Sequence, residues 1–414
     1  MSRLISVGVV VAAVVALATA GCGNAGASGP GAANGAASVV PADAVAFVTA
    51  STDLTSSQWH AVTGILLKKA EAQANLSWAN DVRPALGSEV DVAVLPGRQV
   101  VAFAQPDDNA KLDALATKYK VQTRTIGGWT AVAKTTSALD DVANATSHLA
   151  DSNVFVDAMG RLPADALVRA YASGSGTTMG DTGFEWFAAS LTGTADGLKL
   201  AGFGHPAAGA PSPGAPYAPA LVDRIPSGAL AVLDFRVPAQ GFALLQKLLG
   251  ADATGVPKQL GTLLGGETAL YVRPGLPIPE VTLVTEPADT SAASQALDDL
   301  LGALPTTGMF SNVELHRAVV DGRLVVSTTQ RGIDEYRSSG PKLSADPSFL
   351  EARKQSGMPA EVSGLAYVDV KDVLPLLQLA GLQLPAGMPD LRTFAAYGGT
   401  DGGDLTFTAF LGVG

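Results

Sequence analysis

The sequence offers few side chains that could carry out chemistry. A general base in an enzyme is most often a histidine or a carboxylate held within hydrogen-bond reach of the reacting group. The chain has four histidines and one cysteine, and no histidine has a second histidine or cysteine at metal-ligand spacing. Nucleophile-elbow, dinucleotide-binding, Walker-type and calcium-loop patterns are also missing from the sequence. The sequence therefore predicts a protein that is not an enzyme, with no catalytic residue, no metal and no cofactor.

Two glutamates form the best polar pair. Glu89 ends the stretch Leu86-Gly87-Ser88-Glu89, and Glu267 ends the similar stretch Leu264-Gly265-Gly266-Glu267, each just before an apolar segment. In a functional interpretation, the two carboxylates face a shared cleft. In a structural interpretation, which we favour, each accepts backbone N–H bonds at a tight turn. The pair is kept as a candidate polar site.

Cys22 closes an N-terminal segment that has the three parts of a secretory signal. Arg3 supplies a positive end, an apolar run extends from Leu4 to Ala20, and small residues lead into the cysteine. This run of about 17 residues is at the short limit for a membrane-spanning helix. The sequence therefore predicts a signal peptide over residues 1–21.

The stretch Thr19-Ala20-Gly21-Cys22 resembles the lipobox of bacterial lipoproteins, although that motif usually has leucine where Thr19 stands. The resemblance implies that Cys22 is the lipidation site and the mature N-terminus of an exported protein. Two acyl chains would anchor it to the cell membrane on the extracytoplasmic side. Cleavage after Ala20, which would release a soluble protein with a free thiol, is the alternative. The lack of a second cysteine favours lipidation, because a lone exposed thiol is a liability.

Composition indicates a tether followed by a globular chain. Residues 22–38 consist almost entirely of small, uncharged residues and are expected to form a flexible linker to the lipid anchor. Over the whole chain, 47% of residues are hydrophobic and 16% charged, which is typical of a packed fold. The net charge of −11 argues against a nucleic-acid partner. The partners we expect are the membrane, through the anchor, and an envelope protein or an apolar ligand.

The folded part is predicted to be an internal duplication. Five sequence blocks recur in the same order, which chance explains poorly. The paired blocks are 40–48 with 225–233, 86–96 with 264–274, 100–106 with 281–287, 121–135 with 313–329, and 162–171 with 358–367. We therefore expect a first repeat over 39–205, a linker rich in proline, alanine and glycine over 206–220, and a second repeat over 221–414.

Each repeat is predicted to be α+β, with mainly antiparallel sheets and helices packed on them. Short apolar runs around Pro96-Gly97, Pro274-Gly275 and Asp321-Gly322 indicate hairpins. Helices are expected at 56–73, 109–118, 291–304 and 373–380. A proline leads four strands and is expected to be the first strand residue, where its missing N–H does no harm; these are Pro41, Pro163, Pro226 and Pro359.

This arrangement resembles an uncharacterised family of bacterial exported proteins, known as the domain of unknown function 3352. The resemblance rests on Val40-Pro41-Ala42-Asp43 with the apolar strand after it, and on the two Leu-Gly-x-Glu stretches that contain Glu89 and Glu267. It covers most of the chain after Cys22. It implies an exported protein but no activity, because none is assigned to the family.

Three classes of function remain open. A membrane-anchored envelope lipoprotein with a non-catalytic binding or scaffolding role is the preferred class, since nothing catalytic stands out. A carrier of a lipid or another apolar ligand is the first alternative, because a sheet with helices can enclose an apolar cavity. A hydrolase with an unrecognised nucleophile is the second. A dry cavity, a polar cleft with a paired nucleophile and base, or a filled core would distinguish them.

Overall fold

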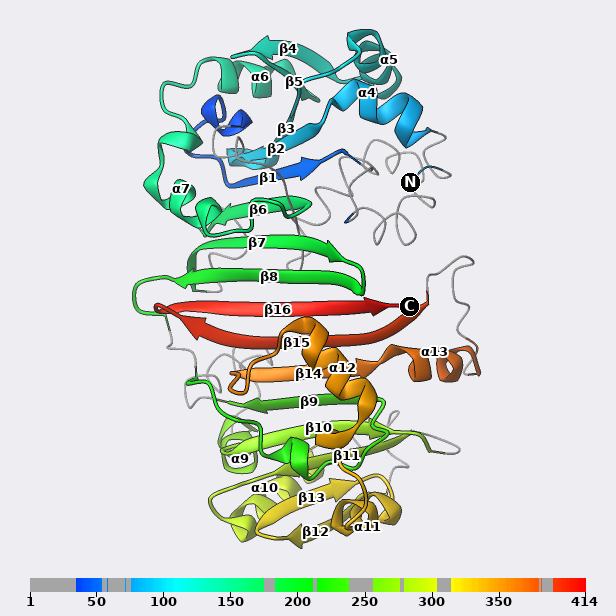
Figure 1. The fold of residues 1–414 in the computed structure, drawn as a ribbon. Coiled ribbons are helices and arrows are strands. Elements are labelled where there is room, and N and C mark those ends of the chain that lie inside the picture. The colour runs from blue at the N-terminus through cyan, green and yellow to red at the C-terminus, as the bar shows by residue number, and fades with distance from the viewer. Residues whose placement is uncertain are drawn as a thin grey trace.

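One antiparallel sheet of 16 strands organises the molecule (Figure 1). The computed structural model describes residues 35–53, 58, 71, 76–174, 183–210, 214–237, 256–275, 279–303, 314–379, 381 and 390–414. Nine α-helices lie in this described part, and every strand pair in it is antiparallel. The predicted α+β class with antiparallel strands is confirmed.

The strands divide into two sets along the chain. The first half contains β1 (Ala46–Ser51), β2 (Glu89–Leu95), β3 (Gln99–Ala104), β4 (Gln122–Ile126), β5 (Trp129–Ala133), β6 (Val168–Ser173), β7 (Phe184–Thr194) and β8 (Gly197–Pro206). The second half contains β9 (Ala231–Arg236), β10 (Glu267–Arg273), β11 (Glu280–Thr285), β12 (His316–Val320), β13 (Arg323–Ser327), β14 (Gly364–Asp369), β15 (Leu391–Asp401) and β16 (Asp404–Val413).

Helices connect these strands. The α-helices are α4 (Arg83–Leu86), α5 (Asn109–Tyr119), α6 (Thr136–Ala143), α7 (Asn153–Gly160), α9 (Val256–Leu263), α10 (Thr290–Ala303), α11 (Gln330–Arg337), α12 (Pro347–Ser356) and α13 (Val370–Leu379). The short helices are η1 (Ala36–Ser38), η3 (Trp78–Val82), η4 (Pro96–Arg98), η5 (Leu149–Asp151), η7 (Leu221–Asp223) and η8 (Leu343–Ala345).

The strand order is the same on both sides of the central pair. From the middle outwards, the first half has the order β8-β7-β6-β1-β2-β3-β5-β4, and the second half has β16-β15-β14-β9-β10-β11-β13-β12. β8 and β16 pair from Gly204 with Leu405 to Gly197 with Gly412. The two expected units at 39–205 and 221–414 therefore share one sheet and meet edge to edge, in the middle of Figure 1.

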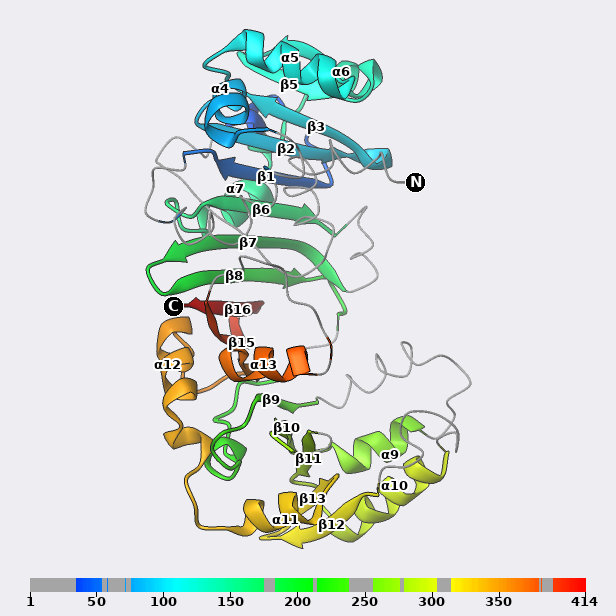
Figure 2. The same ribbon diagram turned by 90° about the vertical axis from the view of Figure 1, so that its right-hand side faces the viewer.

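One face of the sheet, the core face, carries the two largest hydrophobic clusters. In each half, a phenylalanine from a helix meets a strand tyrosine edge to face. Phe155 of α7 lies 5.2 Å from Tyr171, and Phe349 of α12 lies 5.2 Å from Tyr367, between ring centroids. On the opposite face of the second half, α9 and α10 cover a smaller cluster that includes Leu297 and Val326. Figure 2 shows α12 on one side of the sheet and α9 and α10 on the other.

Local sequence signals predicted several elements correctly. The segment 109–118 is α5, 291–304 is α10 within one residue, and 373–380 lies in α13 apart from its last residue, which is outside the described part. Most of the expected helix at 56–73 also lies outside the described residues. Asp321 and Gly322 have φ of 50° and 77°, as a two-residue hairpin turn requires, and Val320 pairs with Arg323 across it. The hairpins around Pro96-Gly97 and Pro274-Gly275 are β2–β3 and β10–β11.

The four prolines do not begin strands. Pro41, Pro163, Pro226 and Pro359 stand five residues before β1, β6, β9 and β14, which start at Ala46, Val168, Ala231 and Gly364. Pro41 and Pro226 instead form isolated bridges with His148 and Lys342. The expectation that they are the first strand residues is wrong, because the turn after each proline takes up the intervening residues.

Both expected linkers are shorter than predicted. Ala36 and Ala37, inside the expected linker 22–38, belong to η1 and are fully buried, so the folded part begins by residue 36. In the 206–220 segment, Tyr217 is buried and pairs with Val362 through two backbone hydrogen bonds of 2.9 Å. The composition of both segments indicated flexible linkers. Residues distant in sequence, Asp91 for Ala36 and Val362 for Tyr217, hold the backbone in place.

We expect the aromatic pair of the second half to be a main source of stability. Phe349→Ala removes a side chain that is 1% exposed and should lower the free energy of unfolding by about 3–5 kcal/mol. Leu350→Ala on the same helix is the matched control, because that side chain is 46% exposed, and should cost less than about 1 kcal/mol. Urea denaturation followed by circular dichroism measures both; equal losses would contradict the assignment.

Candidate functional site

The structure does not bring Glu89 and Glu267 together. They begin β2 and β10, and eight strands lie between these two strands in the sheet. Neighbouring strands are about 4.8 Å apart, so the two carboxylates are separated by roughly 40 Å along the sheet. They therefore share no cleft, and the interpretation that needed one does not hold.

Glu267 holds a short helix in place. Its side chain is buried, and its Oε1 accepts the backbone N–H of Leu221, the first residue of η7, at 2.6 Å. Its Oε2 forms an ion pair with Arg236 at 3.1 Å. A carboxylate at a helix N-terminus satisfies backbone donors that have no partner within the helix. Glu267 is thus a backbone acceptor, as the structural interpretation proposed, although the N–H comes from η7 and not from its own turn.

Asp91 performs the corresponding task in the first half. Its Oδ2 accepts the N–H of Ala36, the first residue of η1, at 2.7 Å, and its side chain is fully buried. Burial raises the pKa of Asp91 to about 7, and the negative charge of Glu89 adds to the rise. Hydrogen bonds from Thr49 and Ala36 and the charge of Arg169 act in the opposite direction. Asp91 lies two residues after Glu89 on the same face of β2, so one strand face supplies both carboxylates.

A second buried aspartate lies on β9. Asp234 is fully buried, and its Oδ1 accepts the hydroxyl hydrogen of Tyr217 at 2.5 Å. Burial raises its pKa to about 7; the Tyr217 hydrogen bond and Arg236 lower it, and Glu267 raises it. The guanidinium of Arg236 lies 4.2 Å from the centre of the Tyr217 ring. This network fastens the segment before η7 to the sheet.

Neither aspartate was predicted as a functional residue from the sequence, although a signal was available. Asp91 interrupts Val90–Val94, and Asp234 interrupts Ala231–Phe235, both otherwise apolar strands. A carboxylate inside such a strand must find a partner or stay protonated, because burying its charge is costly. The partners, Ala36 and Tyr217, could not be identified from the pattern of the strands.

A third polar cluster joins the two halves. Asp404, at the start of β16, pairs through Oδ1 with Nδ1 of His205 at 2.6 Å and through Oδ2 with Arg161. The His205 ring stacks on Trp186 at 5.5 Å. Burial raises the pKa of Asp404, but the hydrogen bonds from Arg161 and His205 outweigh it and leave the pKa below its usual range.

The histidine–aspartate pair resembles half of a catalytic triad but lacks a nucleophile. Among the described residues, the polar partner of His205 is Asp404, and no hydrogen bond joins its ring to a serine, threonine or cysteine side chain. The described residues also contain no group of three or more histidine, cysteine or carboxylate side chains that could bind a metal ion. The contact that this cluster makes is structural: His205 of β8 pairs with Asp404 of β16.

Two adjoining clefts lie in the first half, where β1 begins and β2 and β6 end. The larger has a volume of about 830 Å³ and the smaller about 540 Å³. Residues that line both are Ala42, Asp43, Leu95 and Pro96. The larger is also lined by Gln99, Asp141 and the segment 144–147, and the smaller by Arg98, Ser152 and Tyr171. Carboxylate, amide and hydroxyl groups thus line an open trough, suited to a polar ligand.

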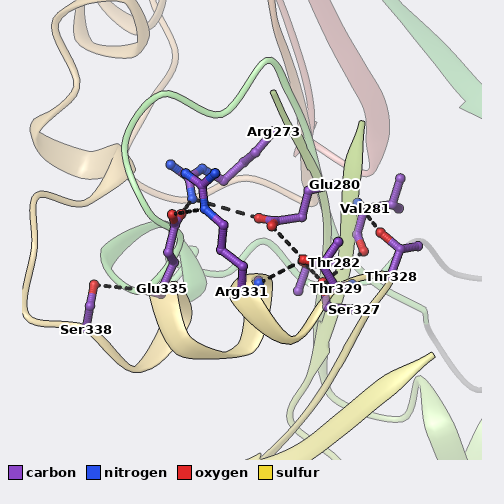
Figure 3. Close-up of polar contacts among 11 residues, drawn as sticks. Arg273, Glu280, Val281, Thr282, Ser327, Thr328, Thr329, Arg331, Glu335 and Ser338 are labelled. Atoms are coloured by element: carbon purple, nitrogen blue, oxygen red, sulfur yellow. Dashed lines mark hydrogen bonds and ion pairs between the residues drawn. The ribbon is translucent and has the colours of Figure 1, made fainter. Parts of the chain in front are cut away.

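At the corresponding strand ends of the second half lies an ion-pair network (Figure 3). Arg273, the last residue of β10, pairs with Glu335 of α11 and lies 3.8 Å from Glu280 at the start of β11. Glu280 accepts the hydroxyl hydrogen of Thr329 at 2.7 Å, and Glu335 accepts a hydrogen bond from Arg331 at 2.6 Å. Glu280 is almost fully buried, so the guanidinium compensates a charge that water cannot reach.

One candidate residue from the sequence remains. Cys22 lies outside the described residues. None of the described helices is long and apolar enough to cross a membrane. Tyr171 and Tyr367, at corresponding places in β6 and β14, are buried core residues.

Comparisons with known proteins give no functional information. No protein-family model matches the chain, and no curated protein matches it. Solved structures of TP0453 match weakly. Crystal form IV has a TM-score of 0.28 and 13% identity over 46% of this chain and 79% of that chain. Crystal form III has a TM-score of 0.25 and 12% identity over 46% and 78%. At these scores the similarity supports no argument about fold or function.

We expect Asp91 to make stability depend on pH. Its pKa is about 7 in the folded protein and near 3.8 when unfolded, so the folded state binds more protons in between, and its contribution to stability falls as pH rises from about 4 to 7. Asp91→Asn keeps an oxygen for the Ala36 N–H and removes the titration. Relative to wild type, the variant should gain on the order of 1–4 kcal/mol between pH 5 and pH 8.

Urea denaturation at the two pH values measures this gain. Asp113→Asn, an exposed site on α5, is the matched control for loss of one charge. If wild type and Asp91→Asn change in parallel between pH 5 and pH 8, the assignment of a proton to buried Asp91 is wrong.

Proposed function

We propose that this chain is an exported lipoprotein, anchored to the cell membrane through Cys22, whose folded part is a non-catalytic binding platform of the envelope. The observation that carries the binding role is the open polar trough beside Asp43 and Asp141, at the strand ends of one continuous sheet. An accessible trough on a rigid sheet supports recognition of a partner, because little ordering is needed on binding.

The state of the titratable groups supports a non-catalytic role. Asp91 and Asp234 have pKa values raised to about 7, a range that suits a general base, but both are completely buried and already hold structural donors. Asp404 holds Arg161 and His205 at the junction of the halves. These carboxylates are committed to the fold, and a substrate could reach Asp91 or Asp234 only after local unfolding.

The anchor is inferred from sequence. Residues 23–34, between Cys22 and the described part, are small and uncharged, and a flexible chain of this composition has an end-to-end distance of roughly 20 Å. Such a tether would keep the folded part close to the membrane. The net charge of −11 agrees with partners other than nucleic acid. An apolar ligand is a weaker candidate, because the described trough presents carboxylates, amides and hydroxyls.

The proposal includes an internal duplication and membership of the domain of unknown function 3352 family. Shared strand order on the two sides of β8 and β16 supports duplication. So do the two aromatic pairs at 5.2 Å and the two short helices whose first N–H groups meet a buried carboxylate. The Leu-Gly-x-Glu stretches, which precede β2 and β10, are the sequence side of the same correspondence.

Cys22→Ala tests the anchor. Wild type should fractionate with membranes and be released by detergent, whereas Cys22→Ala should move to the soluble exported fraction, because both acyl chains are lost. Ser28→Ala, in the same tether, is the matched control and should remain with membranes. Immunoblots of the fractions and mass spectrometry of the N-terminal peptide measure the outcome. Identical partition of both variants, with no acyl chain on wild type, would contradict the proposal.

A further inference from the structure

The two halves differ at one corresponding place. In both, the last residue of a strand pairs across a hairpin with the first residue of the next strand: Leu95 with Gln99, and Arg273 with Glu280. In each half, the following hairpin leads into a helix, α6 or α11, whose N-cap is a threonine. An acidic residue stands six positions after that threonine. These acids are Asp141 after Thr135 and Glu335 after Thr329. The first half therefore keeps the acid of α6 but has leucine where the second half has arginine.

Because the first half lacks that arginine, two polar side chains there, Asp141 and Gln99, have no cationic partner among the described residues. Asp141 accepts a hydrogen bond from Nε2 of Gln99 at 3.1 Å, and within the described part it has no ion-pair partner. The oxygen of that amide, Oε1 of Gln99, is buried and has no hydrogen-bond partner among the described residues. A buried acceptor without a donor costs free energy that a bound donor would recover. Both groups line the larger cleft.

The charged residues around Arg273 in the second half also differ from those around Leu95 in the first half. In the second half, Arg273 and Arg224 stand close enough to Lys342 to lower its pKa, after burial, which is the larger cause. Their counterparts in the first half, counted from the paired prolines and hairpins, are Leu95, Val39 and His148. The larger cleft contains the carboxylates of Asp43 and Asp141 and no lysine or arginine; Arg98 lines only the smaller one. The potential in the larger cleft therefore favours a cation.

We propose that the larger cleft binds an arginine side chain of a partner polypeptide, in the place that Arg273 fills in the second half. A guanidinium is preferred to an ammonium group because its planar set of donors can reach the Asp141 carboxylate and Gln99 Oε1 together. A polypeptide is preferred to a small cation because the two clefts form one trough, in which residues on either side of the arginine can lie. This inference rests on the binding role proposed above and specifies the chemistry of the partner.

Calorimetric titration of the purified full chain tests the proposal, with the acetylated, amidated tripeptide Gly-Arg-Gly as the probe. The control peptide carries citrulline, which keeps the shape of arginine but has no charge. The arginine peptide should bind, and the citrulline peptide should bind at least about tenfold more weakly, since a charged hydrogen bond is lost. Equal affinities, or no heat of binding for the arginine peptide up to millimolar concentration, would overturn the proposal.

Protein variants locate the site. Asp141→Asn should weaken the arginine peptide at least about tenfold, whereas Asp140→Asn, the neighbour that pairs with Arg124 at 2.8 Å, should leave the affinity unchanged. The double variant Leu95→Arg with Gln99→Glu copies the second-half network into the first and should not bind the peptide. Circular dichroism melts confirm that each variant is folded. An unchanged affinity in Asp141→Asn would overturn the proposal even if the double variant fails to fold.

The outcome is separable from that of the anchor experiment. Failure of the arginine peptide, with membrane partition still dependent on Cys22, rejects the arginine site and leaves the lipoprotein. Partition that does not depend on Cys22, with selective arginine binding intact, rejects the anchor and leaves the site.

Discussion

Backbone pairing between β8 and β16 is the constraint on which the rest of the structure depends. β8 and β16 are the last strands of the first and second halves. They pair from Gly204 with Leu405 to Gly197 with Gly412. An unpaired edge in either half would expose a row of backbone donors and acceptors. Pairing the two edges removes that exposure and joins the two sets of eight strands into one sheet of 16. It also places corresponding strands at equal distances on either side of the central pair, which keeps β2 and β10, and with them Glu89 and Glu267, far apart.

Buried carboxylates provide the second level of organisation. Asp91 and Glu267 each accept the first N–H of a short helix, η1 or η7, and so attach the chain segment before β1 or β9 to the sheet. Burying a charge is unfavourable, and the two halves compensate it differently. Glu267 has Arg236 as an ion-pair partner at 3.1 Å, while burial and Glu89 drive Asp91 towards its protonated form. A buried carboxylate can thus hold a short helix either as an ion pair or with a raised pKa. In both cases the carboxylate is buried and not accessible to a ligand.

The sequence could predict what neighbouring residues decide and little of what distant residues decide. The Asp321-Gly322 hairpin and α5 follow from backbone preferences and side-chain periodicity within a dozen residues, and both were predicted. The repeated blocks indicated two α+β units, but the way in which they join depends on β8 meeting β16, strands more than 190 residues apart in the chain. The shared cleft for Glu89 and Glu267 failed for that reason. Ala36 and Tyr217 were assigned to linkers because small or proline-rich surroundings conceal the hydrogen bonds that fix them.

The difference between the two halves is more informative than their similarity. In the second half, the guanidinium of Arg273 pairs with Glu335 and lies 3.8 Å from Glu280. Removing it would leave the buried carboxylate of Glu280 without this cation. The corresponding place in the first half, with Gln99, Asp141 and Leu95, needs no internal cation. The amide of Gln99 is neutral, and the carboxylate of Asp141 is exposed to water. With an amide in place of the buried acid and a leucine in place of the arginine, this part of the first half has no internal ion pair among its described residues, as the proposed arginine site requires.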